Sequence, residues 1–129
     1  MTNKLFGTDG VRGVAGFYPM TADFAFKLAE ILSQTVCTDK KKIAIGKDTR
    51  ISGDMIEAAL SAGFTANGID VILLGIVPTP LVTLKTPELG VDMSLMITAS
   101  HNPYQDNGIK LIDQNGDKFS DDFYAKIEK

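Results

Sequence analysis

The sequence predicts an α/β domain of three layers (α/β/α), in which a mixed, mostly parallel sheet of four strands lies between helices. Two observations predict this fold. Short continuous apolar segments alternate with longer segments of helical periodicity, and turn residues separate the two kinds. Short apolar runs are typical of strands that are buried on both faces. The expected strands are Lys42–Gly46, Ile69–Leu74, Val91–Ile97 and, less fully buried, Gly108–Ile112.

Two longer helices follow from apolar side chains at helical spacing. The first is expected over Thr21–Val36, with Thr21 as its N-cap because a threonine hydroxyl can accept from the first free backbone N–H groups. The second is expected over Gly53–Asn67, with Ser52 as its N-cap and Gly68 as the residue that ends it.

Shorter helices are expected after Pro80 and from Ser120 onward. Between the last two strands the spacing is too short for a crossover helix, and the polar loop Thr98–Asn107 takes its place.

The composition limits the classes of function. The chain of 129 residues fits one domain, with 44% hydrophobic residues for a core. Its formal net charge of −3 lacks the basic excess of a typical nucleic-acid binder. No segment approaches the roughly 20 apolar residues of a membrane span, and Met1–Gly10 does not resemble a secretory signal. We therefore expect a cytoplasmic protein that binds neither nucleic acid nor membrane. The single cysteine, Cys37, is interpreted as a packing residue.

The polar loop after the third expected strand holds the first candidate site. In open α/β sheets, ligands bind outside the carboxyl ends of strands, which is where Ser100 falls. A serine hydroxyl could carry a phosphoryl group, and His101, the only histidine of the chain, could help with protons or with binding. The alternative is a solvent-exposed turn that Asn102 and Pro103 hold, and the residues alone leave both interpretations open.

Two other loops carry arginine beside glycine. Phe6–Gly13 has glycines that let the backbone approach an anion, and Arg12 adds a planar fork suited to phosphate. A plain glycine-rich turn is an equally good interpretation. In Gly46–Gly53, Arg50 could face a phosphate, but we favour an ion pair with Asp48 that holds the loop.

The last expected strand places Lys110 opposite to its apolar neighbours, so that it points either into a cleft beside Ser100 or to solvent. Asp113–Asp117 imitates the start of a calcium loop, but Lys118 stands where that loop needs glycine. We interpret Asn115-Gly116 as a turn instead.

Taken together, these motifs resemble the α-D-phosphohexomutase superfamily. Thr98–Pro103 matches its phosphoserine loop, and Asn107–Lys110 matches the segment that follows. Phe6–Gly13 is similar to the amino-terminal motif of the family, in the form typical of members that act on glucosamine phosphates. Gly46–Gly53 matches as well, so that the resemblance runs from about Lys4 to the end of the chain.

The resemblance implies a phosphoryl shuttle between Ser100 and a hexose phosphate, here glucosamine 6-phosphate, through a bound 1,6-bisphosphate, in amino-sugar metabolism and the supply of peptidoglycan precursors. It implies that Arg12, Lys110 and Asn102 bind phosphate or substrate, and that His101 belongs to the same catalytic group. It also implies a Mg²⁺ ion on the Ser100 phosphate.

The resemblance further implies that residues 1–129 are the first of four domains and that domains II–IV are absent from this chain. The aspartate-rich loop that holds the metal in the family, Asp-Gly-Asp-x-Asp-Arg, has no match here. We therefore expect the remaining domains of the enzyme as partners, and no catalysis by this chain alone. The alternatives are a phosphomannomutase or phosphoglucomutase domain, or a non-catalytic module that binds phosphosugars or a protein.

Overall fold

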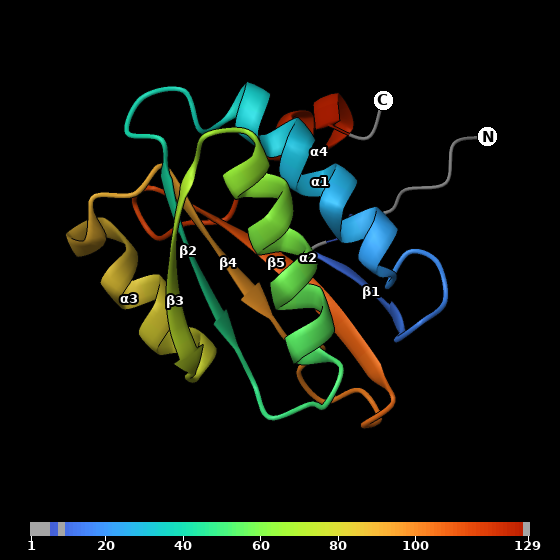
Figure 1. The fold of residues 1–129 in the computed structure, drawn as a ribbon. Helices are drawn as coiled ribbons and strands as arrows, with labels where there is room; N and C mark the ends of the chain where they lie inside the picture. Colours follow the sequence, from blue (N-terminus) through green and yellow to red (C-terminus); the bar gives the residue numbers. More distant parts are fainter. Residues whose placement is uncertain (1–5, 8–9, 128–129) are drawn as a thin grey trace.

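A mixed sheet of five strands forms the middle layer of the computed structural model, which describes residues 6–7 and 10–127 (Figure 1). The strand order is β1-β5-β4-β2-β3. β2 is parallel to both β3 and β4, whereas β5 is antiparallel to β4 and β1. The elements are β1 (Val11–Val14), α1 (Ala22–Thr35), β2 (Lys42–Lys47), α2 (Gly53–Ala66), β3 (Asp70–Ile76), α3 (Thr79–Leu89), β4 (Met93–Ile97), β5 (Asp106–Asp113) and α4 (Asp121–Ile127).

The predicted α/β class, the mixed sheet and the three layers are confirmed, but the prediction of four strands is wrong by one. The missed strand is β1, which the sequence suggested only as part of a glycine-rich segment, either an anion-binding loop or a plain turn. It is short, it contains Arg12 and Gly13, and its partners lie far away in the chain, with Val11 opposite Ile109. Because β1 pairs with a segment almost one hundred residues away, its own four residues show no periodicity of apolar side chains that would predict a strand.

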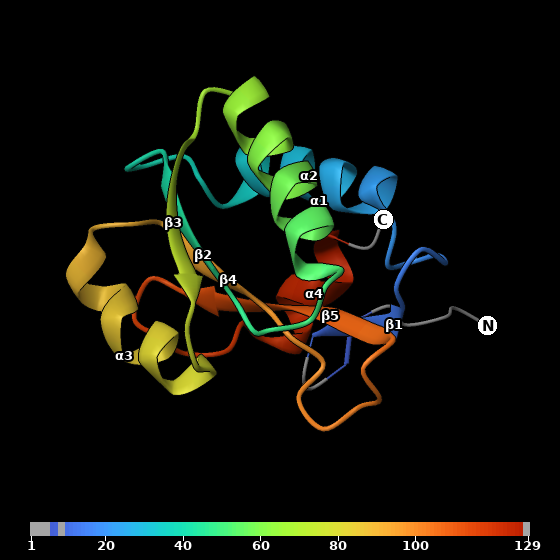
Figure 2. The ribbon, with the colours of Figure 1, turned by 60° about the horizontal axis from the view of Figure 1, so that its bottom comes forward.

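The larger core lies between the sheet and the pair α1 and α2, which lie side by side on one face (Figure 1). α2 approaches α1 closely at Gly63, where a Cβ atom would lie 2.6 Å from the Cβ of Ala29. α3 covers the opposite face through a smaller cluster, and Figure 2 shows the sheet between the two helical layers. That cluster consists of Val82, Met96 and Ile112, with Leu74 and Val77 against it.

Capping explains most of the helix boundaries. The predicted N-cap of α1 is confirmed, because Phe24 N donates to Thr21 Oγ1 at 3.1 Å. At the start of α4, Phe123 N donates to Ser120 Oγ at 3.2 Å, at the residue where the sequence predicted this helix to begin. Ser52 is the N-cap residue of α2, as predicted, but its side chain makes no capping hydrogen bond. Ser52 already has helical dihedral angles, so its hydroxyl instead accepts from the buried Asn107 Nδ2 at 2.8 Å and links the start of α2 to β5.

The part of the chain that the structure describes includes no helix with the length and apolar character needed to cross a membrane.

Cys37 packs into the larger core and is 1% exposed, as the packing interpretation predicted. Burial, and more weakly the carboxylate of Asp92, raises the pKa of the Cys37 thiol from 9.0 to about 12. A thiol whose pKa is higher in the folded state stabilises the fold below its unfolded pKa. This contribution is lost as the pH rises from 9.0 towards about 12, because the unfolded chain loses its proton first.

We therefore expect the free energy of unfolding to fall with pH above about 9, and to fall less steeply in Cys37→Ala. Thiol labelling at pH 8 should be slower in the native chain than in the denatured chain by about 10³-fold or more, since the thiolate is scarcer and also buried. Urea titrations at pH 7 and pH 10, with labelling followed by absorbance, measure both effects. Fast labelling of the native chain would show that Cys37 is not packed as described.

Candidate functional site

Two loops that are far apart in sequence begin side by side at one edge of the sheet. The parallel pairing of β2 with β4 places Lys47 opposite Ile97, so the loop after β2 and the loop after β4 leave the sheet together (Figure 1). A backbone hydrogen bond from Asp48 N to Ile97 O, 3.1 Å long, extends this pairing into the loops. The site is therefore at the carboxyl ends of two parallel strands, as the sequence predicted for Ser100.

Polar side chains bind these two loops to each other. The Asp48 carboxylate accepts from Thr98 Oγ1 at 2.7 Å and from Arg50 Nη1, which confirms the ion pair expected between Asp48 and Arg50. Arg50 Nη2 also donates to two carbonyl oxygens of the other loop, Ser100 O at 3.2 Å and Asn102 O at 2.7 Å. The contacts of Arg50 with the serine loop were not predicted, because only the pairing of β2 with β4 brings these residues together.

Ser100 is exposed and has a left-handed backbone conformation, with φ of 54°. This region is unfavourable for residues with a Cβ atom. Two contacts hold it: Ser100 N donates to Thr98 Oγ1 at 3.0 Å, and Ser100 O accepts from Arg50. His101 follows in the same turn and is exposed as well. A turn of this kind presents its hydroxyl at the surface, where another group can reach it.

Arg12 reaches the serine loop from β1. Its Nη1 donates to Asn102 Oδ1 at 3.1 Å, and Asn102 Nδ2 donates in turn to Asp106 Oδ2 at 3.2 Å. The stem of Arg12 crosses Gly108, where a Cβ atom would lie 2.9 Å from Arg12 Cγ. The structure thus brings Arg12 and Asn102 into contact. Thr8 and Asp9, which belong to the same glycine motif, lie outside the described residues.

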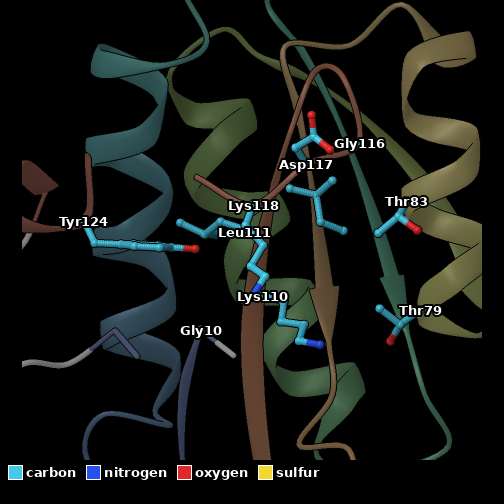
Figure 3. A pocket seen from close by; sticks show the side chains of 10 residues that line it. Gly10, Thr79, Thr83, Lys110, Leu111, Gly116, Asp117, Lys118 and Tyr124 are labelled. Atoms are coloured by element: carbon cyan, nitrogen blue, oxygen red, sulfur yellow. The ribbon is translucent and has the colours of Figure 1, made fainter. Parts of the chain in front are cut away.

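Lys110 lies on β5 opposite Met96 and faces away from the buried Ile109 and Leu111, as the strand alternation predicted. It lines a cavity of about 170 Å³ between β5, α3 and the turn after β5. Figure 3 shows Lys110 and Lys118 among the lining side chains of this cavity. Arg12, opposite Gly108, and Lys110 two residues further along β5 lie on the same face of the sheet.

Two further contacts of the site were missed. Lys47 Nζ lies 2.5 Å from Asp54 Oδ1 and 3.1 Å from Glu57 Oε1. The hydrogen bond with Asp54 raises the pKa of Lys47 most, and the hydrogen bond with Glu57 raises it further. This ammonium is therefore held by α2. The buried Asn107 bridges β5 to Ser52. The sequence does contain a signal for the Lys47 contact: acidic residues follow this lysine seven and ten positions later, across a strand-to-helix turn.

Among the described residues, no three or more His, Cys, Asp or Glu side chains cluster closely enough to hold a metal ion.

The turn interpretation of Asn115-Gly116 is confirmed. Asp113 Oδ1 accepts from the backbone N–H groups of Asn115 and Asp117, each at 2.9 Å, and Gly116 has φ of 89°. The Asp113 oxygen is therefore engaged in closing this turn.

Fold and site together define a class: an α/β/α domain with an exposed serine at the carboxyl edge of its sheet and an arginine bound to the same loop. Residues 3–129 match the family described as "Phosphoglucomutase/phosphomannomutase, alpha/beta/alpha domain I". The chain belongs to this family, the phosphohexomutases, as its domain I.

Relatives and solved structures agree with this assignment. The chain is 53% identical over 131 aligned residues to a phosphoglucosamine mutase of Jannaschia sp. and 51% identical to one of Bartonella tribocorum. It covers 29% of the length of each, whereas 99% and 100% of the chain itself is aligned. A phosphoglucomutase/phosphomannomutase family protein of Burkholderia thailandensis superposes with a TM-score of 0.80 at 29% identity, over 97% of this chain and 29% of that one. The resemblance stated from the motifs is thereby confirmed.

The left-handed conformation of Ser100 makes a testable prediction about stability. Ser100→Ala and Ser100→Gly both remove the hydroxyl, but only glycine removes the Cβ atom that disfavours this conformation. We expect Ser100→Gly to be more stable than Ser100→Ala by about 1 kcal/mol, measured by urea unfolding.

The neighbouring His101 supplies the matched control, since its φ is not positive. There the order should reverse, with His101→Gly less stable than His101→Ala. The same order at both positions would contradict the conformation described for Ser100.

Proposed function

We propose that this chain is the phosphoryl-carrying wall of a phosphohexomutase that interconverts glucosamine 6-phosphate and glucosamine 1-phosphate. The observation that carries the proposal is the exposed Ser100 in a turn that Thr98 and Arg50 hold, with Arg12 bound to the same turn. The substrate is proposed from the printed names of the relatives at about 50% identity, which are phosphoglucosamine mutases.

Two transfers account for the reaction. In the first, the 1-hydroxyl of glucosamine 6-phosphate attacks the phosphorus of phosphorylated Ser100, the bond to Ser100 Oγ breaks, and the 1,6-bisphosphate forms. The intermediate then turns over in the site. In the second, Ser100 Oγ attacks the phosphorus on the 6-position and glucosamine 1-phosphate leaves. In each transfer the attacking hydroxyl loses a proton and the departing oxygen gains one; the departing oxygen is Ser100 Oγ in the first transfer and the 6-oxygen of the sugar in the second. The adjacent His101 is the group of this chain that we propose to accept and return this proton.

Charge neutralisation is the main requirement of phosphoryl transfer. Arg12 offers a planar fork that matches phosphate oxygens, and its hydrogen bond to Asn102 aims the fork at the serine loop. Asn102 Nδ2 could also donate to an oxygen of the substrate in place of Asp106. Lys110 contributes a point charge from the same face of the sheet.

Mg²⁺ is proposed as the cofactor of the complete enzyme, where it would supply further charge neutralisation. The described residues do not form a site for it by themselves. Mg²⁺ prefers near-octahedral oxygen coordination, and this chain would contribute only an oxygen of the Ser100 phosphate. No step above depends on the metal.

The remaining walls of the site are proposed to come from the other domains of the relatives, of which this chain spans 29%. One domain offers one side of a cleft, so we expect no turnover by residues 1–129 alone. We also propose that the complete enzyme is cytoplasmic. A phosphomannomutase or phosphoglucomutase is the second candidate, because the serine loop is shared across the family. The third is a module that binds phosphosugars without catalysis.

Ser100 should be the residue that carries the phosphoryl group. Treatment of a complete enzyme that has this chain as its first domain with a hexose 1,6-bisphosphate should label Ser100, and phosphopeptide mapping locates the label. Ser100→Ala should lose nearly all turnover but keep the fold, since an exposed hydroxyl adds little packing. A label on another residue would overturn the assignment, and binding without turnover in the wild type would favour the module.

Arg12→Ala and Lys110→Ala should each lower kcat/KM in the complete enzyme by the equivalent of about 2–4 kcal/mol, since each removes a cation from the transferring phosphoryl group. Thermal midpoints should shift little. Lys85→Ala is the control, because Lys85 is an exposed lysine of α3 that pairs only loosely with Glu88, at 3.9 Å. A large loss of stability with unchanged kinetics would make Arg12 and Lys110 structural residues.

A further inference from the structure

The guanidinium group of Arg50 lies at the junction of the two loops and is almost buried, with 10% of the side chain exposed. Three acceptors surround it: Asp48 Oδ2, Ser100 O and Asn102 O. Asp48 is itself fixed, because it also accepts from Thr98 Oγ1 and from the backbone N–H of Arg50 at 3.1 Å. Ser100 N donates to that same Thr98 hydroxyl. The backbone N–H and the carbonyl group of Ser100 are thus both held by one connected set of side chains.

This arrangement also sets the direction of a peptide dipole. The carbonyl and N–H groups of a trans peptide point in opposite directions. Because Ser100 O points to Arg50, the N–H of His101 points away from Arg50. Arg50 is nearly buried whereas Ser100 and His101 are exposed, so this N–H lies towards the open side of the turn. An anion near the serine therefore meets a partial positive charge, and the carbonyl oxygens that would repel it are turned away.

We propose that Arg50, held by Asp48 and Thr98, is a positioning residue for phosphoryl transfer. It keeps Ser100 in its left-handed conformation and turns the carbonyl oxygens of Ser100 and Asn102 away from the phosphoryl group, without touching the substrate. This inference rests on the proposed function of Ser100. It assigns to Arg50, the second arginine of the chain, a role that differs from the one proposed for Arg12, which is to neutralise charge on the phosphoryl group itself.

The role requires arginine. A guanidinium presents several N–H donors in a rigid plane and can bind a carboxylate and two carbonyl oxygens at once. An ammonium is a point charge that could keep the attraction to Asp48 but not the fork that spans Ser100 O and Asn102 O. Arg50→Lys therefore separates the charge of Arg50 from its geometry.

The first test measures the conformation of the loop and does not involve catalysis. Nuclear magnetic resonance of the 129-residue chain reports the φ of Ser100 through its HN–Hα coupling and carbon shifts. We expect the wild type to show the signature of positive φ, and Arg50→Lys and Thr98→Val to lose it. Thr65→Val is the matched control, because it removes a threonine hydroxyl that donates within α2, to Ser61 O at 2.7 Å and to Ala62 O at 3.3 Å. Wild-type signals at Ser100 in both loop variants would overturn the proposal.

The second test measures kinetics in a complete enzyme that has this chain as its first domain. Because Arg50 does not touch the substrate, Arg50→Lys should lower kcat by about 10²-fold while KM changes little. Thr98→Val should show the same split, and Thr65→Val should match the wild type. A purely structural role would instead lower the thermal midpoint and leave kcat per folded molecule unchanged, which would contradict the proposal.

Ser100→Ala separates this proposal from the one it rests on. If Ser100→Ala retains turnover, the proposed function fails whatever Arg50 does. If Ser100→Ala is inactive and Arg50→Lys keeps both the wild-type kcat and the wild-type loop signals, only the positioning role fails. Loss of the left-handed conformation together with the fall in kcat supports it.

Discussion

The parallel pairing of β2 with β4 is the constraint on which the rest of the site depends. It aligns Lys47 with Ile97, so that the strand-to-helix loop after β2 and the serine loop after β4 begin next to each other at the carboxyl end of the sheet. Asp48 and Arg50 then come within hydrogen-bond distance of a loop about fifty residues further along the chain. Without this register, the ion pair of Asp48 with Arg50 would be an ordinary exposed pair, a kind that contributes little to stability.

The antiparallel strand β5 adds the second half of the arrangement. Because the chain turns back after the serine loop, β5 runs beside β4 and carries Lys110 on the face opposite to the larger core. β1 is the edge strand beside β5, and its pairing with β5 brings Arg12 across Gly108 to Asn102. Cations from two strands thus lie on one face of the sheet, and Arg12 is the one that contacts the serine loop.

Local features of the sequence predicted most of the fold. Apolar runs located β2, β3, β4 and β5, and a capping residue located the start of α1, because these signals depend on neighbours in the chain. The failures have a common cause. β1, the Asn107 partner of Ser52, and the bonds from Arg50 to the serine loop all depend on contacts between distant segments. The site residues were found as separate motifs, and only the sheet order shows which of them meet.

The left-handed backbone at Ser100 restricts which hydroxyl amino acid this position can hold. Threonine also offers a hydroxyl group, but its second branch at Cβ makes a positive φ a genuine outlier. Tyrosine would place its oxygen far from the backbone that Thr98 and Arg50 hold. The loop therefore selects among hydroxyl side chains by the shape of the main chain, independently of their chemical reactivity. In this sense the identity of the side chain at position 100 is a consequence of the turn.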